Sequence, residues 1–265
     1  MASAEDKGLG SKVYIGTMGW SYRFWISNFY SASAKPNEFL KEYSRHFSTV
    51  EVNSTFYRFP YGSTIKKWND QTPEHFRFSL KFPRAITHEK MLKDCTEYAK
   101  SFMARVAPLG EKLGVMLLQF PPEFGSQHLH LLNDFLEDLP KENRFAVEVR
   151  NKNLLDEKLY SILRENEVAL ALVDSSIMPS IETLTTDFTY IRLEGDREKV
   201  NGNLGRVEID RAEDIVTWAN KIRSFSDRVA RIYVYFSKYY SGHPPTDATK
   251  LSELLHARNN PANGV

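Results

Sequence analysis

The stretch TVEVNSTFY, residues 49–57, decides how the rest of the chain is interpreted. It predicts a short β-strand in which two valines alternate with polar residues. Glu51 and Asn53 lie two residues apart, so both side chains leave the face opposite to Val50 and Val52. A carboxylate on the inner face of a buried strand is costly unless it is paired or used. The stretch therefore indicates a polar site built on strands.

Composition limits the classes of protein to consider. The chain has 265 residues, 42% hydrophobic and 26% charged, with a net charge of +1. This balance gives no general reason to expect nucleic acid or an anionic membrane as partner, although it allows a local basic patch. The single cysteine, Cys95, excludes an intrachain disulfide and is a weak candidate nucleophile. With no signal peptide or long apolar run, we expect a cytoplasmic protein without a membrane partner.

Strand-like and helix-like segments alternate along the chain. The predicted strands cover residues 13–16, 49–53, 76–82, 114–120, 144–150, 168–174, 188–194 and 231–237. The predicted helices cover residues 39–47, 63–69, 96–107, 128–139, 155–165, 209–225 and 246–256, and the crossover at 175–187 has little helical periodicity. Eight such units favour a single-domain (β/α)8 TIM-type barrel. An open doubly wound sheet is the alternative, disfavoured because no GxGxxG follows the first strand.

The barrel is predicted to occupy residues 12–258. A small, polar N-terminal arm (1–11) precedes it, and a C-terminal tail (259–265) follows it.

The phase of each strand predicts which polar side chains point into the barrel. They are Glu51, Asn53, Arg77, Ser79, Lys81, Gln119, Glu148, Arg150, Asp174, Tyr190, Arg192, Glu194, Tyr233, Tyr235 and Ser237. The charged members lie mostly at the C-terminal ends of their strands, where barrel enzymes build their sites. We therefore expect the site at the C-terminal mouth.

Several long motifs resemble one known family. They are GTMGWSYRFW (16–25), FSTVEVNSTFYRFP (47–60), TPEHFRFSLKFPRAITH (72–88), LLQFPPEF (117–124), AVEVRN (146–151) and YIRLEG (190–195). In these motifs the chain resembles the domain-of-unknown-function-72 family, the YecE-like proteins, from about residue 13 to 256. The resemblance implies a TIM-type barrel and no established activity. The chain departs from the family pattern at Glu194, where members often have His, after the eighth strand at Ser237 and Lys238, and near Asn151 and Leu154.

Glu51 and Glu148 are the candidate catalytic acid and base. Two carboxylates at strand ends of one barrel suit a hydrolase-type step such as glycoside hydrolysis. The alternative is a buried ion network, with Glu51 paired to Lys81 and Glu148 to Arg150 or Arg192. Such networks are often not net stabilising, which favours a functional use.

The cationic side chains Lys81, Arg150 and Arg192 indicate binding of an anionic or phosphorylated small molecule. Other predicted ligand contacts are Asn53, Gln119, Asp174, Glu194, Tyr57, His88 and Tyr235, with Trp20 and Tyr22 in the aromatic loop after the first strand. These aromatic residues either stack on a ligand or close the mouth as an apolar lid.

No metal site or cofactor is predicted, because the sequence has no HExxH and no CxxC. A Mg²⁺ ion held by Glu51, Glu148 and Asp174 is a lesser alternative.

The sequence thus predicts a barrel enzyme for acid/base hydrolysis, or a related step, on a sugar-like or phosphorylated small molecule. The alternatives are a nuclease-like or nucleic-acid-binding protein, which the net charge disfavours, and a non-catalytic ligand-binding barrel. The sequence indicates no oligomeric state.

Overall fold

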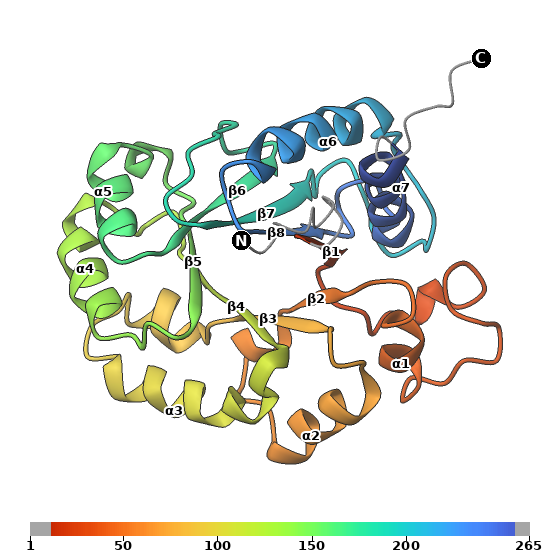
Figure 1. The fold of residues 1–265 in the computed structure, drawn as a ribbon, viewed down its shortest axis with the longest axis horizontal. Coiled ribbons are helices and arrows are strands. Elements are labelled where there is room, and N and C mark those ends of the chain that lie inside the picture. Colours follow the sequence, from red (N-terminus) through yellow and green to blue (C-terminus); the bar gives the residue numbers. More distant parts are fainter. Residues whose placement is uncertain (1–11, 258–265) are drawn as a thin grey trace, which may run out of the picture.

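A computed structural model describes residues 12–257 and contains eight parallel strands in a nearly closed barrel (Figure 1). The strands are β1 (Val13–Thr17), β2 (Thr49–Val52), β3 (Arg77–Lys81), β4 (Leu113–Gln119), β5 (Arg144–Glu148), β6 (Ala169–Ser175), β7 (Phe188–Gly195) and β8 (Arg231–Phe236). The predicted TIM-type barrel is confirmed. The predicted arm (1–11) and tail (259–265) lie outside the described residues.

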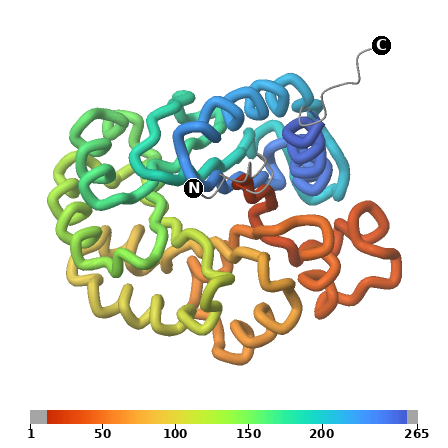
Figure 2. Tube along the Cα trace, viewed as in Figure 1, coloured from red at the N-terminus to blue at the C-terminus, as the bar shows by residue number. Residues whose placement is uncertain are grey.

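Helices surround the strands on the outside of the barrel (Figure 1). They are α1 (Phe39–Tyr43), α2 (Gly62–Gln71), α3 (Thr96–Val106), α4 (Leu129–Glu137), α5 (Glu157–Glu165), α6 (Ala212–Ser226) and α7 (Pro244–Ala257). No helix joins β6 to β7 within this described part of the chain, as the weak periodicity of residues 175–187 predicted. Figure 2 follows the chain once around the barrel, so that the first strand meets the last.

The barrel closes between β1 and β2 without a full ladder of backbone hydrogen bonds. A single bridge joins Met18 to Glu51. Below it, the Tyr43 hydroxyl accepts a hydrogen bond from Thr17 N at 2.9 Å and donates one to Thr49 O at 3.0 Å. The seam is tight, since a Cβ at Gly16 would lie 2.1 Å from Thr49 O. The Tyr43 side chain therefore replaces backbone hydrogen bonds of the sheet at the start of β2, the strand that carries Glu51.

One apolar core lies on each of the two faces of the strands. The outer core lies between strands and helices and includes Val50, Val52, Met116 and Leu118. The inner core fills the barrel and contains Met18, Val115, Leu117, Ala146, Ala169, Ala171, Phe188, Tyr190, Tyr233 and Tyr235. Inward positions thus alternate with outward ones, as barrel packing requires.

Within residues 12–257, no helix is both long enough and apolar enough to cross a membrane.

Candidate active site at the barrel mouth

Arg192 on β7 lies at the centre of a buried ionic cluster. Its Nε donates to Glu51 Oε2 at 2.9 Å and its Nη2 to Glu51 Oε1 at 3.0 Å, a fork-to-fork pair. Glu51 is fully buried and also accepts hydrogen bonds from Tyr190 Oη at 2.8 Å and Asn53 Nδ2 at 3.0 Å. Both oxygens of Glu51 therefore already accept hydrogen bonds from neighbouring side chains. Asn53, predicted as a ligand contact, lines the mouth cavity and also bonds to this carboxylate.

The same guanidinium binds two more carboxylates. Its Nη1 contacts Glu148 Oε2 and lies 2.7 Å from Glu194 Oε1. Arg150 then joins the same two acids, with its Nε 3.2 Å from Glu148 Oε1 and its Nη2 3.7 Å from Glu194 Oε1. The strand phases of β2, β5 and β7 thus bring three acids and two arginines together, as the sequence predicts.

Electrostatics favours the charged forms in this cluster. Burial alone would lower the pKa of Arg192, but Glu148, Glu51 and Glu194 together raise it well above its ordinary value. Burial alone would raise the pKa of Glu194, but Arg192, Arg150 and Arg197 lower it. Arg192 and Glu194 are therefore both charged at neutral pH.

Lys81 on β3 stands beside this network without joining it by an ion pair. Its Nζ contacts Gln119 Oε1 and lies 3.9 Å from the centre of the Phe56 ring. The Lys81–Glu51 pair considered from the sequence is not formed, because Arg192 occupies both Glu51 oxygens. Burial, followed by repulsion from Arg192, lowers the pKa of Lys81 to about 8.

Above the network opens a cavity of about 430 Å³. Its cationic lining residues are Lys81, Arg84, Arg150, Arg192, Arg197 and Lys238. Glu194 is the one carboxylate in its lining, because Glu51 and Glu148 lie buried beneath the guanidinium. The mouth therefore presents an excess of positive charge to any molecule that enters.

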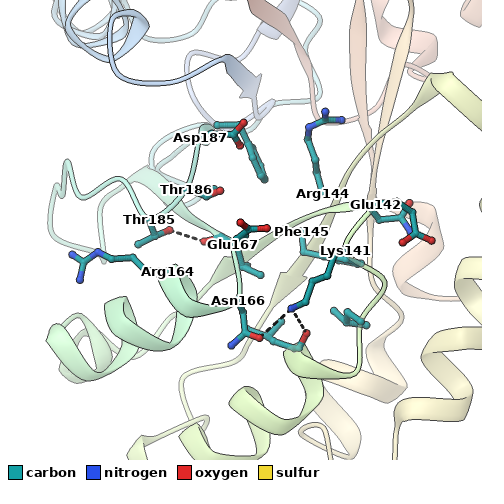
Figure 3. Close-up of a pocket in the computed structure, with 15 residues that line it drawn as sticks. Lys141, Glu142, Arg144, Phe145, Arg164, Asn166, Glu167, Thr185, Thr186 and Asp187 are labelled. Atoms are coloured by element: carbon teal, nitrogen blue, oxygen red, sulfur yellow. Dashed lines mark hydrogen bonds between the residues drawn. The ribbon is translucent and has the colours of Figure 1, made fainter.

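A larger cavity of about 510 Å³ lies where β5, β6 and β7 begin, at the other end of the barrel (Figure 3). Its charges are balanced, with Lys141, Arg144 and Arg164 against Glu142, Glu167 and Asp187. Its polar groups also bond to one another, since Lys141 Nζ donates to Asn166 Oδ1 at 3.3 Å and Thr185 Oγ1 to Val168 O at 2.6 Å. Barrel enzymes build their sites at the C-terminal ends of the strands, so the smaller mouth cavity is the candidate site.

The predicted inward orientation of Asp174 is wrong. Trp218 on α6 donates its indole N–H to Asp174 Oδ2 at 2.7 Å, which places this carboxylate on the helix side of β6. The inward residues of β6 are Ala169, Ala171 and Val173. Strand parity alone could not predict that Asp174 would face outward and bond to Trp218. The carboxylates considered for Mg²⁺ are consequently not brought together, and residues 12–257 contain no group of three potential metal ligands.

The predicted aromatic contacts divide into two groups. Tyr22 and Tyr57 line the mouth cavity, and Tyr57 is 78% exposed. Trp20 instead packs edge-on against Trp68 of α2, with ring centres 5.8 Å apart. Tyr235 is buried inside the barrel, where its hydroxyl is 2.7 Å from both Ser79 Oγ and Thr49 Oγ1. Neither Trp20 nor Tyr235 lines the mouth cavity.

His88 also lines the mouth cavity, on the π-helical turn Ala85–Glu89 that follows β3. Its ring meets the Phe56 ring edge-on at 4.8 Å, and its Nδ1 lies 2.9 Å from Thr87 Oγ1. Burial and nearby Lys81 and Arg150 lower the pKa of His88 to about 4, so it is neutral at pH 7. π-Helical turns often occur at functional sites.

The sequence prediction missed two arginines of the mouth. Arg84 is the N-cap residue of the short π-helical turn after β3, and Arg197 lies in the turn after β7; both segments are too short for periodicity to give a side-chain direction. Arg197 and Lys238 both lie against the Tyr239 ring, each with its charged group 4.9 Å from the ring centre. The sequence offered one signal for Arg84 and Arg197, because each is a basic residue within a few positions of a strand's C-terminal end.

Comparison with known proteins identifies the family. The model of the family described as "Protein of unknown function DUF72" matches residues 14–264. UPF0759 protein YecE of Escherichia coli K12 is 37% identical over 139 residues, 52% of this chain and 48% of that protein, so the match spans about half the length of that relative. UPF0759 protein YunF of Bacillus subtilis 168 is 22% identical over 92% of this chain and 94% of its own length.

Solved structures carry the same fold. A DUF72 family protein from Thermotoga maritima MSB8 is 29% identical, covers 92% of this chain and 99% of its own, and superposes with a TM-score of 0.79. One from Enterococcus faecalis V583 is 20% identical over 92% of this chain and 95% of its own, with a TM-score of 0.74. The resemblance seen in the motifs is confirmed: the chain belongs to the DUF72 family of proteins of unknown function.

Proposed function

We propose that the chain is a TIM-barrel enzyme that binds a small molecule carrying a phosphate or carboxylate group at the mouth of its barrel. The observation that carries this proposal is the ratio of charges lining the mouth cavity, six cationic side chains to one carboxylate. Arginine forks match phosphate and carboxylate groups in geometry as well as charge.

Within this proposal, Glu51 and Glu148 hold Arg192 in place. Both are buried and bound to its guanidinium, so neither is presented to a ligand in the mouth cavity. Arg150, with a side chain 28% exposed, is the cation at the base of the mouth best able to contact the anion. The assignment of the two glutamates as acid and base stays a prediction from the sequence.

The strand β5 offers a matched pair of variants for the test. Arg150 follows its C-terminal end at the mouth, and Arg144 begins it at the opposite end. Arg150→Met and Arg144→Met remove one positive charge each. Titration calorimetry with inorganic phosphate and with a hexose 6-phosphate should give binding that Arg150→Met weakens about tenfold, the loss of one charged hydrogen bond. Arg144→Met should bind as the unaltered chain does. Equal weakening by both variants, or no binding of either anion, would overturn the proposal.

Nucleic acid is the second candidate ligand, favoured by the exposed ring of Tyr57 beside the cationic mouth. Anisotropy titration of a single-stranded oligonucleotide against salt separates the two candidates. Backbone binding predicts an affinity that falls steeply with salt concentration. A small-molecule site predicts no tighter binding of the oligonucleotide than of the hexose phosphate.

A further inference from the structure

Lys81 is the amine at the base of the mouth, and its surroundings differ from those of the neighbouring arginines. The three nearby acids, Glu51, Glu148 and Glu194, are each bound by an arginine. Among the described residues Lys81 makes no ion pair. It has the neutral Gln119 amide and the face of the Phe56 ring as partners.

The position of this amine allows it to meet a ligand. Lys81 is the last residue of β3, so its side chain leaves the strand at the end where barrel enzymes react with substrates. It is only half-buried and lines the mouth cavity. A lysine that is partly desolvated and next to another cation is the kind that proteins use as a nucleophile.

We propose that Lys81 is a nucleophilic amine that forms an imine with the aldehyde or ketone group of an anion-bearing small molecule. This inference rests on the proposed function, because the same cavity would bind the anionic end of that molecule. Arg150 at the base and Arg84 and Arg197 at the rim would hold the phosphate or carboxylate. The carbonyl group would then lie toward Lys81 and the Phe56 ring.

The reaction balances without a further reagent. The Lys81 ammonium loses one proton to water, and its nitrogen attacks the carbonyl carbon to form a C–N bond. The nitrogen then loses a second proton and the carbonyl oxygen takes one up, which gives the hydroxyl of a neutral carbinolamine. That hydroxyl leaves as water when a second proton is added to it, and a C=N⁺ bond to the lysine nitrogen forms. The ammonium and the carbonyl compound are thus converted into one iminium ion and one water. The lowered pKa of Lys81, about 8, makes the neutral amine accessible near pH 7.

Lys238 provides an internal comparison in the same cavity. Its Nζ donates to Asn203 Oδ1 at 2.7 Å and lies 4.9 Å from the Tyr239 ring, at the rim of the mouth. It therefore has the same kinds of partner as Lys81 but does not stand beside Arg192. A reagent that modifies any accessible lysine would treat the two alike.

The test is reductive trapping on the full chain at pH 7. Glyceraldehyde 3-phosphate is added with sodium cyanoborohydride, and peptide mass mapping measures modification at each lysine. We expect Lys81 to be modified at least roughly tenfold faster than Lys238, because burial and the neighbouring Arg192 favour the neutral amine of Lys81 and Lys238 does not stand beside Arg192. The neutral analogue glyceraldehyde should modify Lys81 several times more slowly, and inorganic phosphate should compete with the phosphorylated probe.

Two further measurements separate this inference from the proposed function. Glycerol 3-phosphate carries the anion but no carbonyl, so its binding by calorimetry tests the anion site alone. Binding of glycerol 3-phosphate without selective trapping at Lys81 would overturn the imine and leave the anion site intact. Failure of both would overturn the two together. Lys81→Arg keeps the charge without a nucleophilic amine of this kind, and it should retain glycerol 3-phosphate binding while the trapped product disappears.

Discussion

Arg192 and Glu51 form a doubly hydrogen-bonded ion pair inside the barrel, with Nε–Oε2 and Nη2–Oε1 distances of 2.9 and 3.0 Å. The two residues come from β7 and β2, on well-separated parts of the ring of strands. Glu51 was the residue that made the stretch 49–57 conspicuous in the sequence. In the structure Glu51 lies beneath the Arg192 guanidinium. Its negative charge holds this cation at the mouth of the barrel.

The first prediction concerns the guanidinium itself. Arg192→Met would leave Glu51, Glu148 and Glu194 buried with fewer partners, and loss of one member of a buried ion pair costs about 3–5 kcal/mol. We expect that loss in the free energy of unfolding measured with urea. Arg144→Met is the control, and it should change this free energy by no more than about 0.5 kcal/mol. Similar effects of the two variants would show that the cluster does not support the fold.

The second prediction separates a supporting role of Glu51 from a catalytic one. Glu51→Gln keeps the shape but removes the charge, so it should destabilise the fold by about 1–3 kcal/mol. Anion affinity should be retained or should rise, because less of the Arg192 charge is neutralised. Calorimetry with the hexose phosphate measures this affinity. Loss of binding in a variant of unchanged stability would contradict the supporting role.

The third prediction is a pH dependence caused by Lys81. Burial and Arg192 lower its folded-state pKa from 10.5 to about 8, so the unfolded chain binds more protons between these values. Stability from this group therefore rises as pH increases through that window and is lowest below pH 8. Lys81→Met should raise the free energy of unfolding at pH 7 by roughly 1–3 kcal/mol, with a smaller difference near pH 10. A difference between the two proteins that is constant from pH 7 to 10 would argue against a lowered pKa.

The fourth prediction tests how the barrel closes. Tyr43→Phe removes the hydroxyl that bridges Thr17 N and Thr49 O, leaving two buried backbone groups with one partner fewer. We expect a loss of about 1–3 kcal/mol in the free energy of unfolding. Tyr61, whose ring is 64% exposed, provides the control Tyr61→Phe. Faster amide exchange at Thr17 in the Tyr43 variant, and not in the control, would identify the seam as the part affected.

Strand parity explains how much of this arrangement could be predicted from the sequence. Alternation on β2, β5 and β7 correctly placed Glu51, Glu148 and Arg192 inside the barrel. Parity cannot choose partners, and it therefore did not reveal that one arginine would bind three acids. It also failed for Asp174, because an outward acid is satisfied by the indole of Trp218, a residue distant in the chain.

Residues in short turns after the strands could not be placed from the sequence either. Arg84 and Arg197 have no periodic neighbours to fix their direction, and only the folded loops bring them over the mouth. Trp20 was predicted as a ligand contact because it follows the first strand. The structure turns it toward Trp68 on α2 instead, a contact between helix and loop that no local pattern encodes.

Crystals soaked in selenate, whose selenium scatters anomalously, would show whether the mouth of the barrel binds an anion. We expect an anomalous peak in the mouth cavity, within hydrogen-bond distance of Arg150 and near Lys81. A peak in the cavity at the opposite end, near Arg144 and Arg164, with none at the mouth, would contradict this expectation.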